Sequence, residues 1–522
     1  MTTPPIATAP PSDFRRYVKN ISHQSSVFLI GTLFSTAAGY FFKVYLARVL
    51  GAEALGIYAL GMTVVGLAGV VAAAGLPQAA SRFVAVYSAT GEFRKLGRFL
   101  WSAMAVLLVA NLLVGTLLLL MKSWIAQRLY HTPALASYLR FFVLIMVTGA
   151  LTGFLGQALA GYKDVARRTV ITSFVGQSLT MACTIALLTV GFGFKGYLIA
   201  QIVSALAVLF LLARATWKLT PKPARPPSFG LPILEREIVS FSMVLFAVQG
   251  LEFILSQTDK VLLGIYLNAR EVGIYSIAAA LVGFVPLALQ SVNQIFSPTI
   301  AELHARGDLE LLARLFRSLV KWTLGLTLPL AAVMILFARP IMGMFGPDFA
   351  PGWPVLVAGT FGQLVNCGVG SVGYLLLMSG HQQRLLRIQS VMAVVLVATN
   401  LALIPRMGLL GAALAGAAVT VASNLWYLAE VRKSLGIRPS LRKYLALTLP
   451  AAVMIASLLL FRKFVTVYWP AWGVVAAGLS LGYVVFVGIS FLVALDPDDR
   501  DIARAVWSKV LQMTGARATG GA

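Results

Sequence analysis

The chain has 522 residues, of which 59% are hydrophobic and 11% are charged, and its mean hydropathy is +0.85. No soluble core needs so much apolar surface, so the composition excludes an ordinary soluble protein and indicates a membrane protein. The net charge of +24 does not indicate nucleic-acid binding, because most Lys and Arg residues fall in the termini and in alternate loops. This is the positive-inside bias, which predicts that both termini are cytoplasmic.

The predicted elements are apolar runs of about 20 residues, the length that an α-helix needs to cross the hydrocarbon core. Helices are expected because the runs are apolar on all sides and lipid cannot satisfy unpaired backbone groups. The first six runs cover 25–47, 55–76, 100–121, 138–160, 169–191 and 196–213. The others cover 238–266, 272–297, 318–338, 353–378, 388–405, 408–429, 444–462 and 471–495. The predicted fold class is an all-α polytopic membrane protein with about fourteen transmembrane helices.

A Pro-rich stretch, Thr220–Pro232, separates the sixth run from the seventh and is expected to be extended and solvated. It divides the runs into two lobes of six helices and a final helix pair. The predicted segments are a cytoplasmic N-terminal segment (1–24), an N-lobe (25–213), a cytoplasmic Pro-rich linker (214–237), a C-lobe (238–430), a C-terminal helix pair (444–495) and a cytoplasmic tail with an amphipathic helix (496–522).

An internal repeat relates the two lobes. The sequence Gly-Ile-Tyr begins at Gly56 and again at Gly273, and 273 − 56 = 217. The same offset pairs Lys43 with Lys260. Because six helices return the chain to the side from which it started, the repeat is parallel, with its axis along the membrane normal. The motif itself is expected to be a recurring packing device in which glycine permits a tight entry into a helix.

Several motifs resemble a known family. They are "ARVLGAEALGIYALG", "TDKVLLGIYLNAREVGIYSIA", "FSPTIAEL" and "MGLLGAALAG". They are similar to the O-antigen and exopolysaccharide flippases of the multidrug/oligosaccharidyl-lipid/polysaccharide exporter superfamily, over roughly residues 15–440. The resemblance implies two six-helix bundles around a central cavity in the bacterial inner membrane. It also implies alternating-access transport of a polyprenyl-diphosphate-linked oligosaccharide to the outer leaflet, with a polysaccharide polymerase and export machinery as partners.

Charged residues within the runs are the candidates for substrate binding, because each costs about 2.5–3.5 kcal/mol to insert. Lys43 and Lys260 suit a diphosphate, although Lys43 could equally snorkel to the membrane surface. Gln249 shares the polar face of Lys260 and could bind a sugar hydroxyl or join two helices. Arg48, at the membrane rim, could contact substrate or only anchor its helix.

Two acidic residues are the candidates for ion coupling. Glu252 and Asp259 are two turns apart on one helix face and could bind H⁺ or Na⁺. Alternatively, they neutralise Lys260 and neighbouring polar groups.

Helix-breaking residues can provide bends within the runs, although they are also ordinary in membrane helices. They are Pro286, Pro329, Gly359, Gly362, Gly368, Gly370 and Gly373.

No catalytic motif, metal-ligand cluster or cofactor site is recognised, so the chain is not expected to be an enzyme. A membrane polymerase or ligase would need catalytic external loops, which the predicted topology lacks. Two other transport functions stay open. One is a lipid II flippase, whose substrate is also a polyprenyl diphosphate. The other is a cation-coupled multidrug antiporter, which the paired lysines disfavour because cationic drugs need an acidic cavity.

Overall fold

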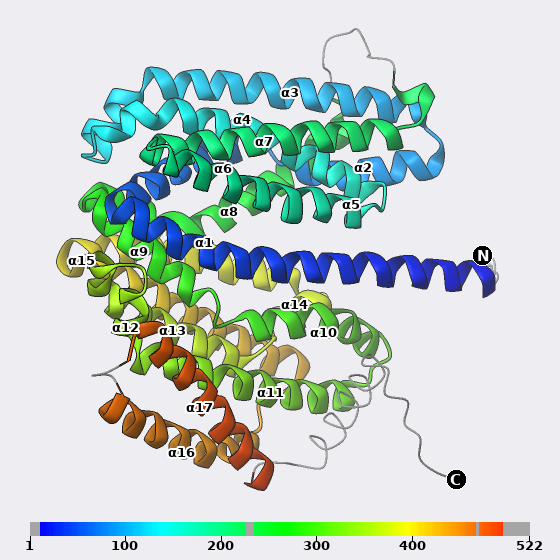
Figure 1. Cartoon of the computed structure of the whole chain (residues 1–522). Coiled ribbons are helices and arrows are strands. Elements are labelled where there is room, and N and C mark those ends of the chain that lie inside the picture. The colour runs from blue at the N-terminus through cyan, green and yellow to red at the C-terminus, as the bar shows by residue number, and fades with distance from the viewer. Residues whose placement is uncertain (1–10, 226–233, 466–468, 494–522) are drawn as a thin grey trace, which may run out of the picture. The chain divides into compact units, whose positions relative to one another are not determined.

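A computed structural model describes residues 11–225, 234–465 and 469–493, which form helices and no strands (Figure 1). The predicted all-α fold is therefore confirmed. The chain divides into two compact units, Met1–Gly273 and Ile274–Ala522.

The first unit begins with α1, Pro11–Ala73, which is broken at Gly51, where φ is +79°. The other helices of this unit are α2 (Leu76–Thr90), α3 (Phe93–Leu120), α4 (Ala134–Gly161), α5 (Val165–Thr169), α6 (Gln177–Thr189), α7 (Gly193–Leu219) and α8 (Arg236–Tyr266). Shorter 3-10 or π-helical segments are Trp124–Leu129, Val170–Gly176 and Lys222–Ala224. In Figure 1, α3, α4 and α7 lie alongside one another, in agreement with their packing.

Packing places α8 in the first unit, because α8 contacts both α1 and α2. By the sequence repeat, α8 is the first helix of the C-lobe. The packing therefore divides the chain after Gly273, whereas the sequence repeat divides it at the linker 214–237. The lobe boundary at the linker stays a prediction. The predicted amphipathic helix of the tail lies outside the described residues.

The core of the first unit joins α2, α3 and α4 through aromatic rings. The ring of Phe99 lies 5.6 Å from that of Phe83 and 6.0 Å from that of Phe154, measured between centroids. All three side chains are almost fully buried. Aromatic pairs at such distances contribute about 0.5–1.5 kcal/mol each beyond the burial of their surface.

The second unit contains the remaining helices. They are the end of α9 (Ala269–Val282), α10 (Leu287–Ala305), α11 (Leu309–Leu336), α12 (Ala338–Gly343), a 3-10 segment (Pro347–Gly352), α13 (Trp353–Val369), α14 (Val372–Met378), α15 (Gln382–Leu435), α16 (Leu441–Val465) and α17 (Ala471–Val493). The predicted C-terminal pair, α16 and α17, packs together and against α11 (Figure 1).

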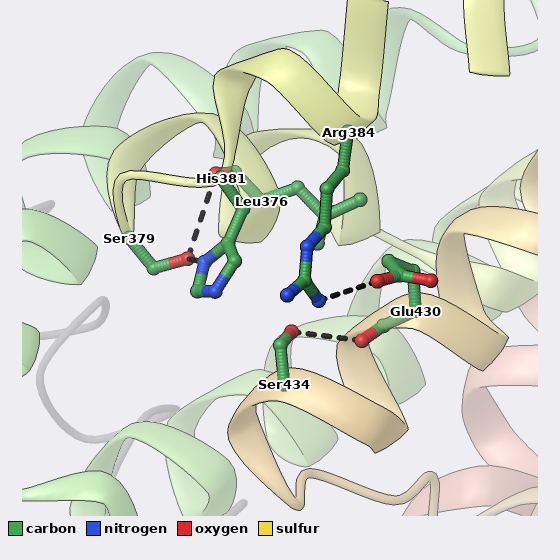
Figure 2. Close-up of polar contacts among 6 residues, drawn as sticks. All are labelled: Leu376, Ser379, His381, Arg384, Glu430 and Ser434. Atoms are coloured by element: carbon green, nitrogen blue, oxygen red, sulfur yellow. Dashed lines mark hydrogen bonds and ion pairs between the residues drawn. The ribbon is translucent and has the colours of Figure 1, made fainter. Parts of the chain in front are cut away.

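The long helix α15 folds back on itself at Gly408, where φ is +57° and ψ is −132°. Arg384, near its start, forms an ion pair with Glu430, near its end (Figure 2). On a straight helix, 46 residues would separate these groups by about 69 Å. The contact therefore requires two antiparallel helices, which the runs 388–405 and 408–429 predicted.

Ten helices of the described chain are long and apolar enough to cross a membrane, or twelve if each of two bent pairs counts as one span. Each bent pair turns by 48°, and the breaks lie just before α10, at Pro286, and at Gly370. Bending was predicted at both residues. The other residues named for bending lie within uninterrupted helices, Pro329 in α11, Gly359, Gly362 and Gly368 in α13, and Gly373 in α14. The total of fourteen transmembrane helices stays a prediction.

The two glycines of the repeated motif lie against each other's helices. A Cβ atom added to Gly56 would lie 1.6 Å from the carbonyl oxygen of Ala269, and one added to Gly273 would lie 2.0 Å from that of Ala52. Real Cβ atoms do not approach backbone so closely, so only glycine fits at either position. The motif is therefore a packing device, as predicted, and the helices that it joins belong to different repeats.

Candidate functional site

The helices α1 and α8 pack together, and each supplies one lysine of the repeat-related pair. Lys43 is exposed on α1, whereas Lys260 is half-buried on α8. The charge of Lys260 acts on the ammonium group of Lys43, so the two groups lie within electrostatic range of each other. The Nζ atom of Lys260 also donates a hydrogen bond of 2.9 Å to Oε1 of Gln257. Two lysines separated by 217 positions in the sequence thus form one local site, here called the lysine pair.

Two like charges in range of each other repel, and the repulsion grows as water is excluded from between them. An anion bound near both would remove the repulsion and replace it with two attractions. The lysine pair is therefore suited to a ligand with two negative charges rather than to a cation.

Gln249 lies on α8, about three turns before Lys260, and is bonded to a neighbouring helix. Its Nε2 atom donates to Oε1 of Gln78 at 3.0 Å, and Nε2 of Gln78 donates back to Oε1 of Gln249 at 3.1 Å. The reciprocal pair joins α8 to α2, which is the helix-joining alternative considered for Gln249. Binding of a sugar hydroxyl by Gln249 stays a prediction, and Gln78 is a polar neighbour that sequence reasoning missed.

The other predicted residues lie on the same two helices. Arg48 is exposed on α1, three residues before the break at Gly51. Glu252 is exposed on α8, and the Oδ1 atom of Asp259 accepts a hydrogen bond of 2.8 Å from the backbone N–H of Lys260. Their roles in binding or ion coupling stay predictions.

A second polar cluster, the α2–α8 clasp, consists of Arg82, Tyr87, Glu235, Glu237 and Phe241. A guanidinium nitrogen of Arg82 lies 3.6 Å from Oε1 of Glu237, and the guanidinium carbon lies 4.4 Å from the ring centroid of Phe241. The hydroxyl of Tyr87 donates to Oε2 of Glu235 at 3.4 Å. These contacts join α2 to the start of α8, just after the Pro-rich linker.

Sequence reasoning missed the clasp because residues 76–90 are too polar to be a membrane run. The signals for the short helix α2 were nevertheless present. Gly75 and Gly91 bound it, both in the left-handed region, and Pro77 stands in its first turn, where proline is favoured.

Tyr87 lies outside the candidate membrane spans, and its pKa is raised to about 12 by burial and by the nearby carboxylates of Glu235 and Glu237. The phenol therefore keeps its proton at physiological pH and can donate a hydrogen bond to Glu235. Because the folded pKa exceeds the ordinary value of 10, the stabilisation is fully present below pH 10. It is lost as the pH rises through about 12.

Arg82→Ala is expected to destabilise the protein by about 1–2 kcal/mol, because it removes the contact with Phe241 together with the ion pair. Glu237→Ala removes only an exposed ion pair, for which about 0–1 kcal/mol is expected. Thermal unfolding of the two purified variants compares these losses. An equal loss in both would contradict the assignment of the larger part to the arginine–aromatic contact.

One further charge was missed in the second unit. Lys321 is only 5% exposed, within α11. It lies three residues from the start of the predicted run 318–338, a position from which a lysine can ordinarily extend to the membrane surface. The packing of α11 buries it, which hydropathy alone does not reveal.

The described part of the chain contains no group of three or more His, Cys, Asp or Glu residues placed to hold a metal ion. Its cysteines, Cys183 and Cys367, are both free.

Two protein-family models match the sequence of this chain. Residues 21–304 match the family model described as polysaccharide biosynthesis protein, and residues 245–406 match the MatE model. A comparison with curated proteins finds no match.

The fold resembles those of solved transporters. A structure of the lipid II flippase MurJ in an inward closed conformation has a TM-score of 0.73 and 17% identity, covering 89% of this chain and 98% of that chain. An inward-facing multidrug resistance MATE family transporter of the MOP superfamily has a TM-score of 0.61 and 16% identity, covering 77% and 94%. A MATE transporter from Vibrio cholerae has a TM-score of 0.53 and 15% identity, covering 80% and 100%. At these identities the likeness shows the fold alone.

The first family model covers more than half of the 522 residues and includes both members of the lysine pair. The chain therefore belongs to the polysaccharide biosynthesis protein family, within the exporter superfamily that its motifs predicted.

Proposed function

We propose that this protein moves a polyprenyl-diphosphate-linked oligosaccharide from the cytoplasmic to the outer leaflet of the bacterial inner membrane, for surface polysaccharide biosynthesis. The observation that carries the proposal is the lysine pair, Lys43 and Lys260, which two packed helices bring within electrostatic range. The family to which the chain belongs supports a polysaccharide-related substrate.

The electrostatics favour a diphosphate over a neutral or cationic ligand. One ion pair at about 4 Å gives about 4 kcal/mol at an effective dielectric constant of about 20, before desolvation is subtracted. A diphosphate diester carries two negative charges, so each lysine can meet one of them. Arg48 and Gln249, on the same helices, extend the proposed site toward the rest of the substrate.

The proposed cycle is alternating access, driven by an ion gradient or by the substrate gradient. Glu252 and Asp259 are the proposed sites for H⁺ or Na⁺. The proposed orientation places both termini in the cytoplasm, where the excess of Lys and Arg lies. A polysaccharide polymerase and the export machinery are the proposed partners.

A lipid II flippase is the second candidate, because MurJ shares the fold and lipid II is also a polyprenyl diphosphate. A multidrug antiporter fits less well. MATE transporters share the fold, but a pair of lysines repels the cationic drugs that such a transporter would carry.

The first test uses cells that lack the protein. Their glycolipids are extracted and analysed. We expect a polyprenyl-diphosphate oligosaccharide to accumulate on the cytoplasmic face, where reagents added outside the cells cannot reach it. Its mass identifies the sugar and separates a polysaccharide unit from lipid II. No accumulation, together with increased sensitivity to cationic drugs, would instead support the multidrug function.

A further inference from the structure

Two tryptophans and an arginine gather where the start of α3 meets the end of α7. The indole rings of Trp101 and Trp217 lie 6.5 Å apart between centroids, with an angle of 80° between their planes. They are 39% and 49% exposed, respectively. The guanidinium carbon of Arg225 lies 5.6 Å from the ring centroid of Trp217. We refer to these three residues as the tryptophan–arginine site.

The site exists because the first residues of the linker dock on the helices. Ala224 is 2% exposed, and a Cβ atom added to Gly97 of α3 would lie 2.5 Å from its carbonyl oxygen. Thr220 is 5% exposed and shares a hydrogen bond of 3.1 Å with the hydroxyl of Tyr162. The expectation of a solvated linker is therefore wrong for this stretch, because Gly97 leaves room for the backbone to pack.

The docked linker also fixes the arginine. The Nε atom of Arg225 donates to the carbonyl oxygen of Thr220 at 3.0 Å, and Nη2 donates to that of Lys218 at 3.4 Å. The indole N–H of Trp101 donates to the carbonyl oxygen of Arg225 at 3.3 Å. These bonds use two of the five N–H groups of the guanidinium, which leaves the planar group oriented and able to donate to a ligand.

The surroundings of the site are basic. The exposed basic residues on the adjoining ends of α3, α7 and the linker are Arg94, Arg98, Arg214, Lys218 and Lys222. A nearby carboxylate in the sequence, that of Glu92, pairs with Lys95 at 3.1 Å. An anion bound at the site therefore meets an excess of positive charge.

We propose that the tryptophan–arginine site binds the phosphate headgroup of an anionic phospholipid. Both α3 and α7 are candidate membrane spans, and exposed tryptophans near the ends of such helices favour the level of the headgroups. A phosphodiester at that level can accept hydrogen bonds from Arg225 and lie close to Lys218 and Lys222, while its glycerol and upper acyl chain pack on the indoles. The site is separate from the lysine pair, the proposed site of the transported diphosphate.

The test measures lipid retention by the full-length protein in native mass spectrometry, during titration with phosphatidylglycerol or phosphatidylcholine. The wild-type protein is expected to prefer phosphatidylglycerol. The double variant Arg225→Gln/Lys222→Gln is expected to bind phosphatidylglycerol about fivefold more weakly for each removed charge. The matched control is Lys122→Gln/Arg128→Gln, which removes two exposed charges beside the exposed Trp124 past the other end of α3. This control is expected to keep the wild-type preference.

Three results would overturn the proposal. They are equal retention of the two lipids by the wild-type protein, an equal loss in the control variant, and displacement of the bound lipid by inorganic phosphate at matched ionic strength. The last would mean that the site binds a free anion. Lys218→Gln/Lys222→Gln provides a second variant if Arg225→Gln unfolds the protein, because both lysines are exposed. It is expected to show the same loss.

Discussion

Lys260→Ala is expected to reduce transport of the lipid-linked oligosaccharide by roughly tenfold to hundredfold, the effect of losing a charged hydrogen bond of about 1.5–3 kcal/mol. Lys43→Ala should reduce it less, because Lys43 is exposed and can extend to the membrane surface, whereas Lys260 is half-buried. The measurement is the rate at which labelled glycolipid becomes accessible on the outer face of vesicles containing each variant.

Lys260→Arg serves as the control, since it keeps the charge and is expected to retain more transport than Lys260→Ala. Removing either lysine also removes the repulsion between them, and in Lys260→Ala this gain offsets the lost hydrogen bond to Gln257. Neither alanine variant should therefore unfold at a lower temperature than the wild type. Normal transport by Lys260→Ala at wild-type protein levels would rule out a diphosphate site at the lysine pair.

Alanine at Gly56 or Gly273 is expected to lower the free energy of unfolding by about 3 kcal/mol, at the upper end of the usual cost of overpacking. The added methyl group would lie within 2.0 Å of a carbonyl oxygen at either position, and backbone cannot rotate away as a side chain can. Protein level in the membrane and the unfolding temperature of purified protein both measure this loss.

Gly250→Ala is the matched control, because a Cβ atom there has nothing within 4 Å and the residue lies within α8. Alanine is expected to be neutral or stabilising at that position, since it favours a helix over glycine by up to about 1 kcal/mol. If Gly56→Ala and Gly250→Ala unfold at the same temperature, α1 and α9 can move apart at Gly56 without loss of stability.

The sequence predicted much of this fold, since the predicted features are local. An apolar run of 20 residues needs a helix whatever surrounds it, and a residue such as Gly408 or Pro286 interrupts that helix by its own backbone chemistry. The fixed offset between Lys43 and Lys260 revealed the repeat in the same direct way. The offset predicted that these lysines occupy equivalent positions in the two repeats. It did not predict that they lie close together.

Other contacts could not be predicted because they join distant segments. Nothing near Gln78 indicates that its amide pairs with Gln249, and nothing in α2 indicates that Arg82 lies over Phe241. The Pro-rich composition also favoured a solvated linker, whereas Gly97 on another helix allows part of it to pack. Such contacts depend on which faces meet, and hydropathy does not determine that.

The contact between the repeated glycines has a symmetry of its own. Gly56 lies against Ala269, and Gly273 lies against Ala52. Because 52 + 217 = 269, Ala52 and Ala269 occupy equivalent positions in the two repeats, as Gly56 and Gly273 do. The two contacts are therefore the same contact made in both directions. This reciprocity is the mark of an interface between two identical subunits. One chain therefore carries, between its two repeats, the reciprocal pairing of a two-fold dimer interface, and this pairing requires glycine at both positions.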